Sequence, residues 1–316
     1  MRRGVALFLI LATALSSSAC ADLSAIRKFT ESAAEVGKRF PALAKDFNAS
    51  CRRRITYREV GQSLLDPIRL AAVAHPQKGS PEEQQLAEAC KEFGPEDEKR
   101  LIEANGILFS YLKVMGELAA DDLISFDKDF DALGDSFTGG NIFNAPEVNA
   151  VKGLAKFLSK AFAEGYRRKQ LKATLEEQNA NVQTAAAQLS KIVARDYVEQ
   201  LELERDQMRS SYKLSIAQYK EYMGRVAAHT AASGGAEFQD PLPIIMVKGQ
   251  WDNEENAIDQ KIAAAQAYAK ALDGVAKGHQ KLYDSRNDLN SKAVLRTVLS
   301  YGSAINTSFE DFRKAF

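Results

Sequence analysis

The chain has 316 residues, of which 45% are hydrophobic and 27% are charged, a composition typical of folded domains. Its 42 basic and 42 acidic residues give a formal net charge of +0. A neutral chain has no general electrostatic attraction to nucleic acid or to anionic lipid, so we expect no nucleic-acid partner.

The first nineteen residues have the pattern of an export signal. Arg2 and Arg3 form a basic start, and the segment 5–15 is apolar except for Thr13. Small residues fill 16–19. An apolar run this short cannot cross a bilayer about 30 Å thick, so the pattern predicts a signal peptide at 1–19 rather than a membrane anchor.

Two cleavage sites fit this signal. Ser17–Ala19 followed by Cys20 resembles the lipobox of bacterial lipoproteins, although Ser17 stands where that pattern usually has leucine. The resemblance implies an acylated Cys20, and Ala21 resembles the sorting rule for the outer membrane of Gram-negative bacteria. The expectation is a protein anchored to the outer membrane and facing the periplasm. The alternative is ordinary cleavage after Ala21, which would release a soluble periplasmic protein.

Cys51 and Cys90 are the other cysteines of the chain. In an exported chain, two cysteines in an oxidising compartment most simply pair with each other. Closing this loop stabilises the fold by about 4 kcal/mol in the chain-entropy model. We expect a structural disulfide, because no Cys-x-x-Cys pattern indicates a redox role.

The segment 20–138 is predicted to form N-terminal helices stapled by this disulfide. Apolar residues recur every three or four positions from Leu23 to Phe47, which indicates a helix over 22–66 with a kink or break at Pro41. Ser80-Pro81 followed by Glu83 is a helix start. A third apolar stripe predicts a helix over 96–138.

The segment 139–316 is predicted to form a long helical hairpin that packs with the N-terminal helices into one bundle. After a helix over 147–165, one arm covers 166–231 and the return arm covers 252–316, and neither arm contains proline. The stripe of the first arm shifts through Val193, Tyr197 and Leu201 before it resumes. The fold class is therefore all-α, an elongated bundle built on an antiparallel hairpin.

Catalytic and metal-binding patterns are weak in this chain. His75, His229 and His279 are too far apart along the predicted helices to share an ion. The acids at 127, 129 and 131 resemble the start of a calcium loop, but Ala132 and Thr138 replace the glycine and glutamate that such a loop needs. Other acidic side chains are expected on solvated helix faces. We expect no enzyme activity, no metal and no cofactor.

The segment 232–251 is expected to be a non-helical tip between the two arms. Pro241 and Pro243 favour a break, and the run 242–247 is apolar. The tip either folds back as a cap on the bundle or contacts a partner. The candidate partner-binding residues are Phe238, Leu242, Ile244, Ile245, Met246 and Trp251.

Two basic clusters, 52–54 and 166–172, are interpreted mainly as solvated faces, with contact to lipid headgroups or an acidic partner as the alternative. The leading functional hypothesis is a non-catalytic lipoprotein that acts as a scaffold or docking module for another envelope protein, held to the membrane by its N-terminal lipid. The alternative is a membrane-active hairpin whose apolar tip, 242–247, inserts into or shapes a bilayer.

Overall fold

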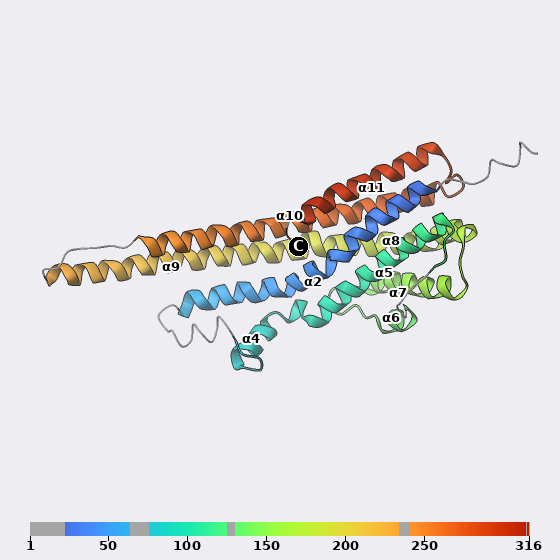
Figure 1. Cartoon of the computed structure of the whole chain (residues 1–316). Coiled ribbons are helices and arrows are strands. Elements are labelled where there is room, and N and C mark those ends of the chain that lie inside the picture. Colours follow the sequence, from blue (N-terminus) through green and yellow to red (C-terminus); the bar gives the residue numbers. More distant parts are fainter. Residues whose placement is uncertain (1–22, 64–75, 125–129, 234–240, 314, 316) are drawn as a thin grey trace, which may run out of the picture.

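The computed structural model describes residues 23–63, 76–124, 130–233, 241–313 and 315. Helices form all of the regular structure in these ranges, and they contain no strand (Figure 1). The predicted all-α class and the helical bundle are confirmed. The predicted signal peptide, Cys20, His75 and Phe238 lie outside the described residues.

The helices follow one another along an elongated bundle (Figure 1). In chain order they are α2 (Ser24–Ser63), α4 (Pro81–Ala89), the 3₁₀ turn η1 (Lys91–Phe93), α5 (Pro95–Ala120), α6 (Phe130–Ser136), α7 (Ala145–Ala163), the 3₁₀ turn η2 (Arg168–Gln170), α8 (Leu171–Lys191), the π-helix η3 (Ile192–Tyr197), α9 (Val198–Ala232), α10 (Leu242–Asp284) and α11 (Lys292–Phe312).

The prediction at Pro41 was a kink or a break, and α2 continues through Pro41 as one helix, so a break does not occur there. A proline removes one backbone donor, but the apolar stripe stays in register on both sides of it. Phe40 and Leu43 are both buried in the core. The packing of this continuous stripe outweighs the lost hydrogen bond.

The start of α4 agrees with its sequence pattern, whereas the predicted helix over 96–138 is too long. The Ser80 side chain accepts a hydrogen bond from the Glu83 amide, as expected for an N-cap. Helix α5 ends at Ala120 because Asp121 takes a left-handed conformation with φ 63°. The Asp121 and Asp122 amides donate to carbonyls of the last turn, which terminates the helix.

Helices α8, η3 and α9 form one long helix from Leu171 to Ala232. Their 21, 6 and 35 residues correspond to roughly 90 Å at about 1.5 Å per residue. The π-helix coincides with the predicted shift of the apolar stripe. A π-helical turn accommodates one more residue than an α-helical turn, which shifts the following side chains around the helix axis. Ile192, Val193 and Tyr197 are all buried as a result.

Helix α10 lies beside this long helix and runs in the opposite direction (Figure 1). Three hydrogen bonds between the two helices show the direction: Asn179 to Gln280, Ser190 to Asp273 and Arg205 to Asp259. The residue numbers increase along the long helix as those of the partners decrease along α10, so the two helices are antiparallel.

The return arm is not the single helix predicted over 252–316. Helix α10 ends at Asp284, and α11 begins at Lys292 and folds back onto α10 and α2. The connecting segment 285–291 is rich in serine, asparagine and aspartate, whose side chains compete with helical backbone bonds. Near the end of α11 the rings of Phe312 and Tyr268 are 5.4 Å apart, in the core.

Helix α2 occupies the centre of the core, between α5, α9 and α11. Phe29 is fully buried where α2, α10 and α11 meet. Gly278 and Gly302 face it, and a methyl group added at Gly278 would overlap the Phe29 ring. The two glycines allow α10 and α11 to approach α2 closely.

Candidate functional site

The far parts of α9 and α10 leave the bundle as a projecting pair of helices (Figure 1). We call this pair the arm and define it as 212–233 with 241–257. Among the described residues of the arm none is buried, whereas Ser211 and Ile258 at its base are. The arm therefore extends beyond the core that holds the other helices.

The arm has an inner and an outer set of apolar side chains. Ile244, Val247 and Trp251 on α10 are half-buried, as are Tyr219 and Met223 on α9, and their spacing of three and four residues marks the seam between the helices. The outer set is exposed, at 56% for Leu242, 60% for Ile245, 66% for Met246, 56% for Tyr222 and 39% for Val226.

The described part of the predicted tip is helical, which corrects the expectation of a non-helical segment over 232–251. Helix α10 begins at Leu242, directly after Pro241, with Pro243 in its first turn. A proline is compatible with the first turn of a helix, where its missing N–H has no helical partner. The residues 242–251 project with the arm and do not fold back over the bundle (Figure 1).

The candidate tip residues have different surroundings. Leu242, Ile245 and Met246 point outward, and Ile244 belongs to the seam. Trp251 lies at the base of the arm, where its ring stacks on Tyr212 at 6.1 Å and its indole N–H donates to Glu255. The structure therefore separates three exposed residues from two that help to hold the arm together.

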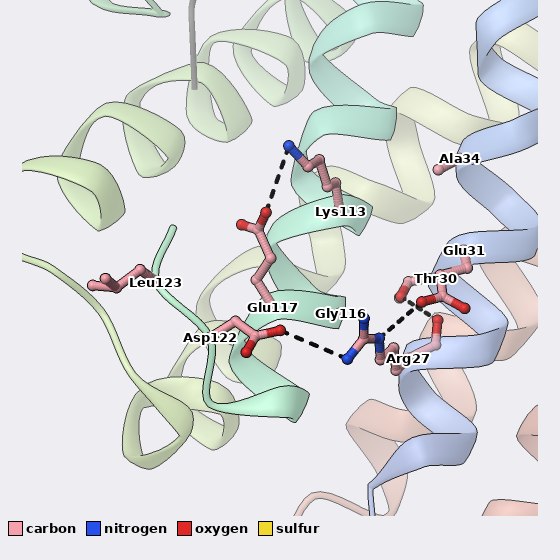
Figure 2. Close-up of a pocket in the computed structure, with 9 residues that line it drawn as sticks. All are labelled: Arg27, Thr30, Glu31, Ala34, Lys113, Gly116, Glu117, Asp122 and Leu123. Carbon is pink, nitrogen blue, oxygen red and sulfur yellow. Dashed lines mark hydrogen bonds and ion pairs between the residues drawn. The ribbon is translucent and has the colours of Figure 1, made fainter. Parts of the chain in front are cut away.

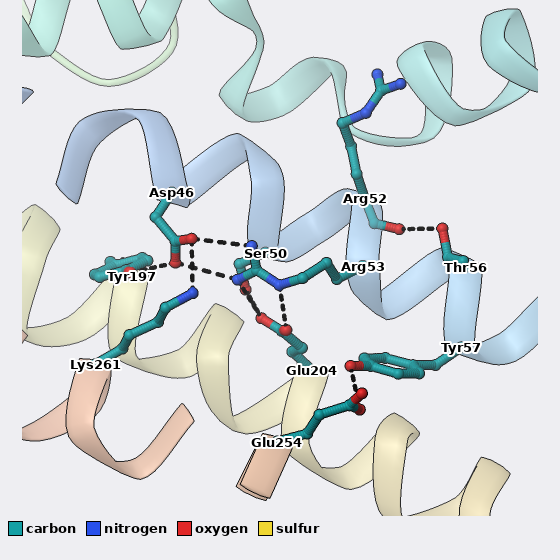
Figure 3. Close-up of polar contacts among 10 residues, drawn as sticks. All are labelled: Asp46, Ser50, Arg52, Arg53, Thr56, Tyr57, Tyr197, Glu204, Glu254 and Lys261. Atoms are coloured by element: carbon teal, nitrogen blue, oxygen red, sulfur yellow. Dashed lines mark hydrogen bonds and ion pairs between the residues drawn. The ribbon is translucent and has the colours of Figure 1, made fainter. Parts of the chain in front are cut away.

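A buried polar cluster joins α2, α9 and α10 below the arm (Figure 3). It contains two carboxylates, two cations and two hydroxyl groups. Its members are Asp46, Ser50, Arg53, Tyr197, Glu204 and Lys261.

Arg53 is the centre of this polar cluster. Its Nε lies 2.6 Å from Glu204 Oε1, and its Nη1 lies 2.9 Å from Asp46 Oδ1. Lys261 Nζ and the Tyr197 hydroxyl also donate to Asp46, at 2.8 and 2.7 Å. Every charge has an opposite charge beside it, as a buried ionic group requires.

The protonation states of the cluster follow from these contacts. Burial favours the neutral form of Asp46, but hydrogen bonds from Arg53 and Lys261 hold the pKa of its carboxyl below the ordinary value. Burial and the neighbouring Asp46 carboxylate raise the pKa of the Tyr197 hydroxyl, so it stays a donor. The paired charges and hydrogen bonds of this network hold the helices together.

Glu204 and Arg53 depart from their sequence-based interpretation. Acidic side chains and the cluster 52–54 were expected on solvated faces, yet the Glu204 side chain is buried and that of Arg53 is mostly so. Glu204 and Arg53 belong to different segments of the chain. The periodicity of one segment therefore does not reveal that these two side chains meet.

A second polar group lies inside the bundle around His279. Its Nε2 is 2.7 Å from the Tyr111 hydroxyl and its Nδ1 is 2.9 Å from Asn179 Oδ1. Because Asn179 presents its oxygen, Nδ1 carries the proton and Nε2 accepts from Tyr111. Burial lowers the pKa of His279 to about 3, so the ring is neutral. His229, in contrast, is exposed on the arm.

A surface pocket of about 330 Å³ lies between α2 and the end of α5 (Figure 2). Arg27 pairs with Glu31 at 2.8 Å and with Asp122 at 3.7 Å, and Lys113 pairs with Glu117 at 3.5 Å. Burial raises the pKa of Glu117 above its ordinary value, an effect that Lys113 partly offsets. The charged groups of this pocket mostly neutralise one another.

Metal ligands do not gather within the described ranges: no group of three or more His, Cys, Asp or Glu side chains is close enough to hold an ion. Asp127 and Asp129 of the calcium-like pattern lie outside these ranges. None of the helices that the structure describes is long and apolar enough to cross a membrane.

Cys51 and Cys90 form a disulfide, as predicted. The bond joins α2 to the end of α4, and with Ile55 and Leu86 it forms a small apolar cluster separate from the main core. The disulfide therefore attaches α4 to the bundle.

We compared the chain with known protein families, characterised proteins and solved structures. No family model matches the chain, and neither the characterised proteins nor the solved structures contain a significant match.

Proposed function

We propose that this protein is a non-catalytic exported lipoprotein, a helical scaffold that presents its arm to another envelope protein. The observation that carries the proposal is the exposed apolar set at the start of α10, on the outer face of the arm. Leu242, Ile245 and Met246 follow the i, i+3, i+4 spacing of a helix that binds in an apolar groove. Tyr222 and Val226 on α9 are also exposed apolar side chains of the arm.

The charges of the arm favour a protein partner. Lys213, Lys220, Arg225 and Lys248 are balanced in number by four acidic residues of the arm, Glu221, Asp252, Glu254 and Glu255. A nearly balanced surface gives little attraction to anionic lipid. Methionine and tyrosine adapt well to a protein groove. The partner is therefore an envelope protein with an apolar groove of helix width.

Anchoring at Cys20 is the second part of the proposal. The signal-like segment 1–19 and the disulfide both support export, and the lipobox-like residues before Cys20 support acylation. The proposed location is the periplasmic face of the outer membrane. After a high-salt wash, which weakens electrostatic contacts with lipid, Cys20→Ser should move the protein from the membrane fraction to the soluble fraction. Unchanged fractionation would contradict acylation and leave the docking proposal to be tested separately.

Photo-crosslinking tests docking. A photoreactive amino acid at Ile245 or Met246 should capture one envelope protein in intact cells, whereas the same probe at Glu202, exposed nearer the bundle, should not. The captured protein, once purified, should bind the wild-type chain and lose about tenfold or more in affinity with Met246→Asp. Lys213→Asp, also on the arm, is the matched control.

Two results would contradict docking by the arm. One is crosslinks that form only within the protein's own chain. The other is equal binding by Met246→Asp and Lys213→Asp.

The second candidate function is a membrane-active hairpin, favoured by the same exposed side chains at the start of α10. In this case the protein without its lipid should float with neutral vesicles, and Ile245→Asp should abolish flotation. Flotation that does not depend on Ile245 would exclude this candidate.

A further inference from the structure

The end of the bundle opposite the arm gathers several chain segments, and we call it the basal end (Figure 1). It contains the start of α2, the turn 121–123, the segment 164–172 and the turn 285–291. Arg27 lies 3.7 Å from Asp122, and Arg167 Nη1 donates to the Asp121 carbonyl at 3.1 Å. These contacts hold the segments of the basal end together.

Two large apolar side chains are exposed at the basal end. Leu123 is 68% exposed and Phe162 is 55% exposed. Leu123 follows Asp121 by two residues, and Phe162 precedes Arg167 by five, so both flank the contact between Arg167 and Asp121. Exposed residues of this size next to basic side chains are typical of surfaces that enter a lipid interface.

The segment 164–172 is strongly basic. Arg167, Lys169 and Lys172 are exposed, and Glu164 is the one acidic residue of the segment. Among the described residues these three cations have no ion-pair partner, because Arg167 donates to a carbonyl oxygen that has no net charge.

Two nearby carboxylates are paired with other cations. Arg27 pairs with Asp122, and Arg286 pairs with Glu176 at 2.7 Å. The segment 164–172 itself has four basic residues and one acidic residue, an excess of positive charge in a chain that is neutral as a whole.

The position of Cys20 indicates which surface this charge meets. Cys20 is three residues before Leu23, the first described residue, so it lies within about 10 Å of the basal end at any extension of the chain. An acyl chain on Cys20 would place this end, and no other part of the bundle, against the bilayer.

We propose that the basal end docks on an anionic phospholipid surface. Arg167, Lys169 and Lys172 contact the phosphate groups, and Leu123 and Phe162 enter the interface. A lipid on Cys20 would hold the protein at the membrane, and the basic patch would add an electrostatic attraction that fixes which face of the bundle meets the phospholipid. The contact orients the bundle with its arm pointing away from the membrane. The orientation rests on the proposed acylation of Cys20, whereas the lipid contact itself does not.

Flotation of the non-acylated chain tests the lipid contact. The protein begins at residue 20 with Cys20→Ser, and the probes are vesicles of phosphatidylcholine with or without phosphatidylglycerol. We expect binding only to the vesicles with phosphatidylglycerol, and binding should weaken as salt is added. Arg167→Gln, Lys169→Gln and Lys172→Gln together should weaken it by about 100-fold, at about fivefold per basic residue.

Matched variants on the arm provide the control. Lys213→Gln, Lys220→Gln and Lys248→Gln remove the same charge and should leave the affinity within about twofold. Phe162→Asp should weaken binding by about tenfold, and Met246→Asp should not.

Three results would overturn the inference: no binding to phosphatidylglycerol, equal losses from the two triple variants, or a loss caused by Met246→Asp alone. The last result would support the membrane-active arm instead. The first two results do not bear on capture of a partner protein by the arm, so the two proposals fail separately.

Discussion

The Tyr111 hydroxyl donates to Nε2 of His279 at 2.7 Å, and this bond joins α5 to α10 in the interior of the bundle. The bond requires a neutral imidazole, because a protonated Nε2 cannot accept. The pKa of about 3 in the folded state is well below the ordinary value of 6.5.

The stability of the protein should therefore depend on pH through His279. Below pH 6.5 the unfolded chain binds a proton that the folded chain does not, so stability is present above this pH and is lost as the pH falls toward 3. Between pH 7 and pH 5 the expected loss is about 2 kcal/mol from this residue alone. Urea unfolding at both pH values measures it.

His279→Gln is the comparison for this measurement. Glutamine does not titrate, so the variant should lose less stability than the wild type between pH 7 and pH 5, whatever its stability at pH 7. His229→Gln, at an exposed site, should keep the wild-type dependence. An unchanged slope in His279→Gln would show that the ring is protonated in the folded protein.

Glu204→Ala should destabilise the bundle by about 3 kcal/mol or more in urea unfolding, because it removes a carboxylate that Arg53 and Ser50 contact. Glu202→Ala, two residues away on the exposed side of α9, should change stability by less than about 0.5 kcal/mol. Equal losses of unfolding free energy in the two variants would show that the Glu204 side chain contributes no more to stability than an exposed side chain does.

Gly278→Ala should lower stability by about 1–3 kcal/mol, because the added methyl group overlaps the Phe29 ring. Gly224 lies in α9 where nothing is within 4 Å of an added methyl group. Gly224→Ala should raise stability by up to about 1 kcal/mol through helix propensity. Thermal unfolding of both variants checks the pair, and a neutral Gly278→Ala would mean that α10 can move away from α2.

Reduction of the Cys51–Cys90 disulfide should release α4 and leave the main bundle folded. The small apolar cluster at this bond is separate from the core, and loop closure contributes about 4 kcal/mol to the attachment. Limited proteolysis should then cut within Pro81–Phe93 before any site in α8. The Cys51→Ser/Cys90→Ser variant should behave like the reduced protein, and simultaneous loss of all helices would contradict this expectation.

Much of the fold could be predicted from local patterns, because each pattern has a local physical cause. The apolar stripes predicted the helical class, Ser80-Pro81 predicted the start of α4, and the stripe shift near Val193 and Tyr197 coincided with the π-helix. The cysteine pair followed from the expected oxidising compartment. In each case a few neighbouring residues contain the whole signal.

Two of the errors concerned prolines, whose effect depends on their position in a helix and on the packing around them. Pro41 did not break α2, because its flanking stripe is buried on both sides. Pro241 and Pro243 were interpreted as ending a helix, but they begin α10.

The candidate site was predictable only in part. The apolar run 242–247 was visible in the sequence, and the structure shows which of its side chains point outward. The polar cluster was not predictable, since periodicity gives the buried face of a helix but not its partner: Asp46 and Lys261 meet across more than 200 residues of chain.

The arm also has a mechanical consequence. The arm is attached to the bundle at one end only, and we call that attachment the clamp. The clamp consists of the Tyr212–Trp251 stack and of the Arg53–Glu204 pair nearer the core. From Tyr212 to the end of α9 the arm extends about 30 Å. A rotation of about 5° at the clamp would displace the outer end by about 3 Å, close to the width of a methyl group. Met246 lies five residues from Trp251, about 8 Å from the clamp, so the same rotation would displace it by less than about 1 Å. The contacts at the base therefore position Met246 much more accurately than they position the end of α9.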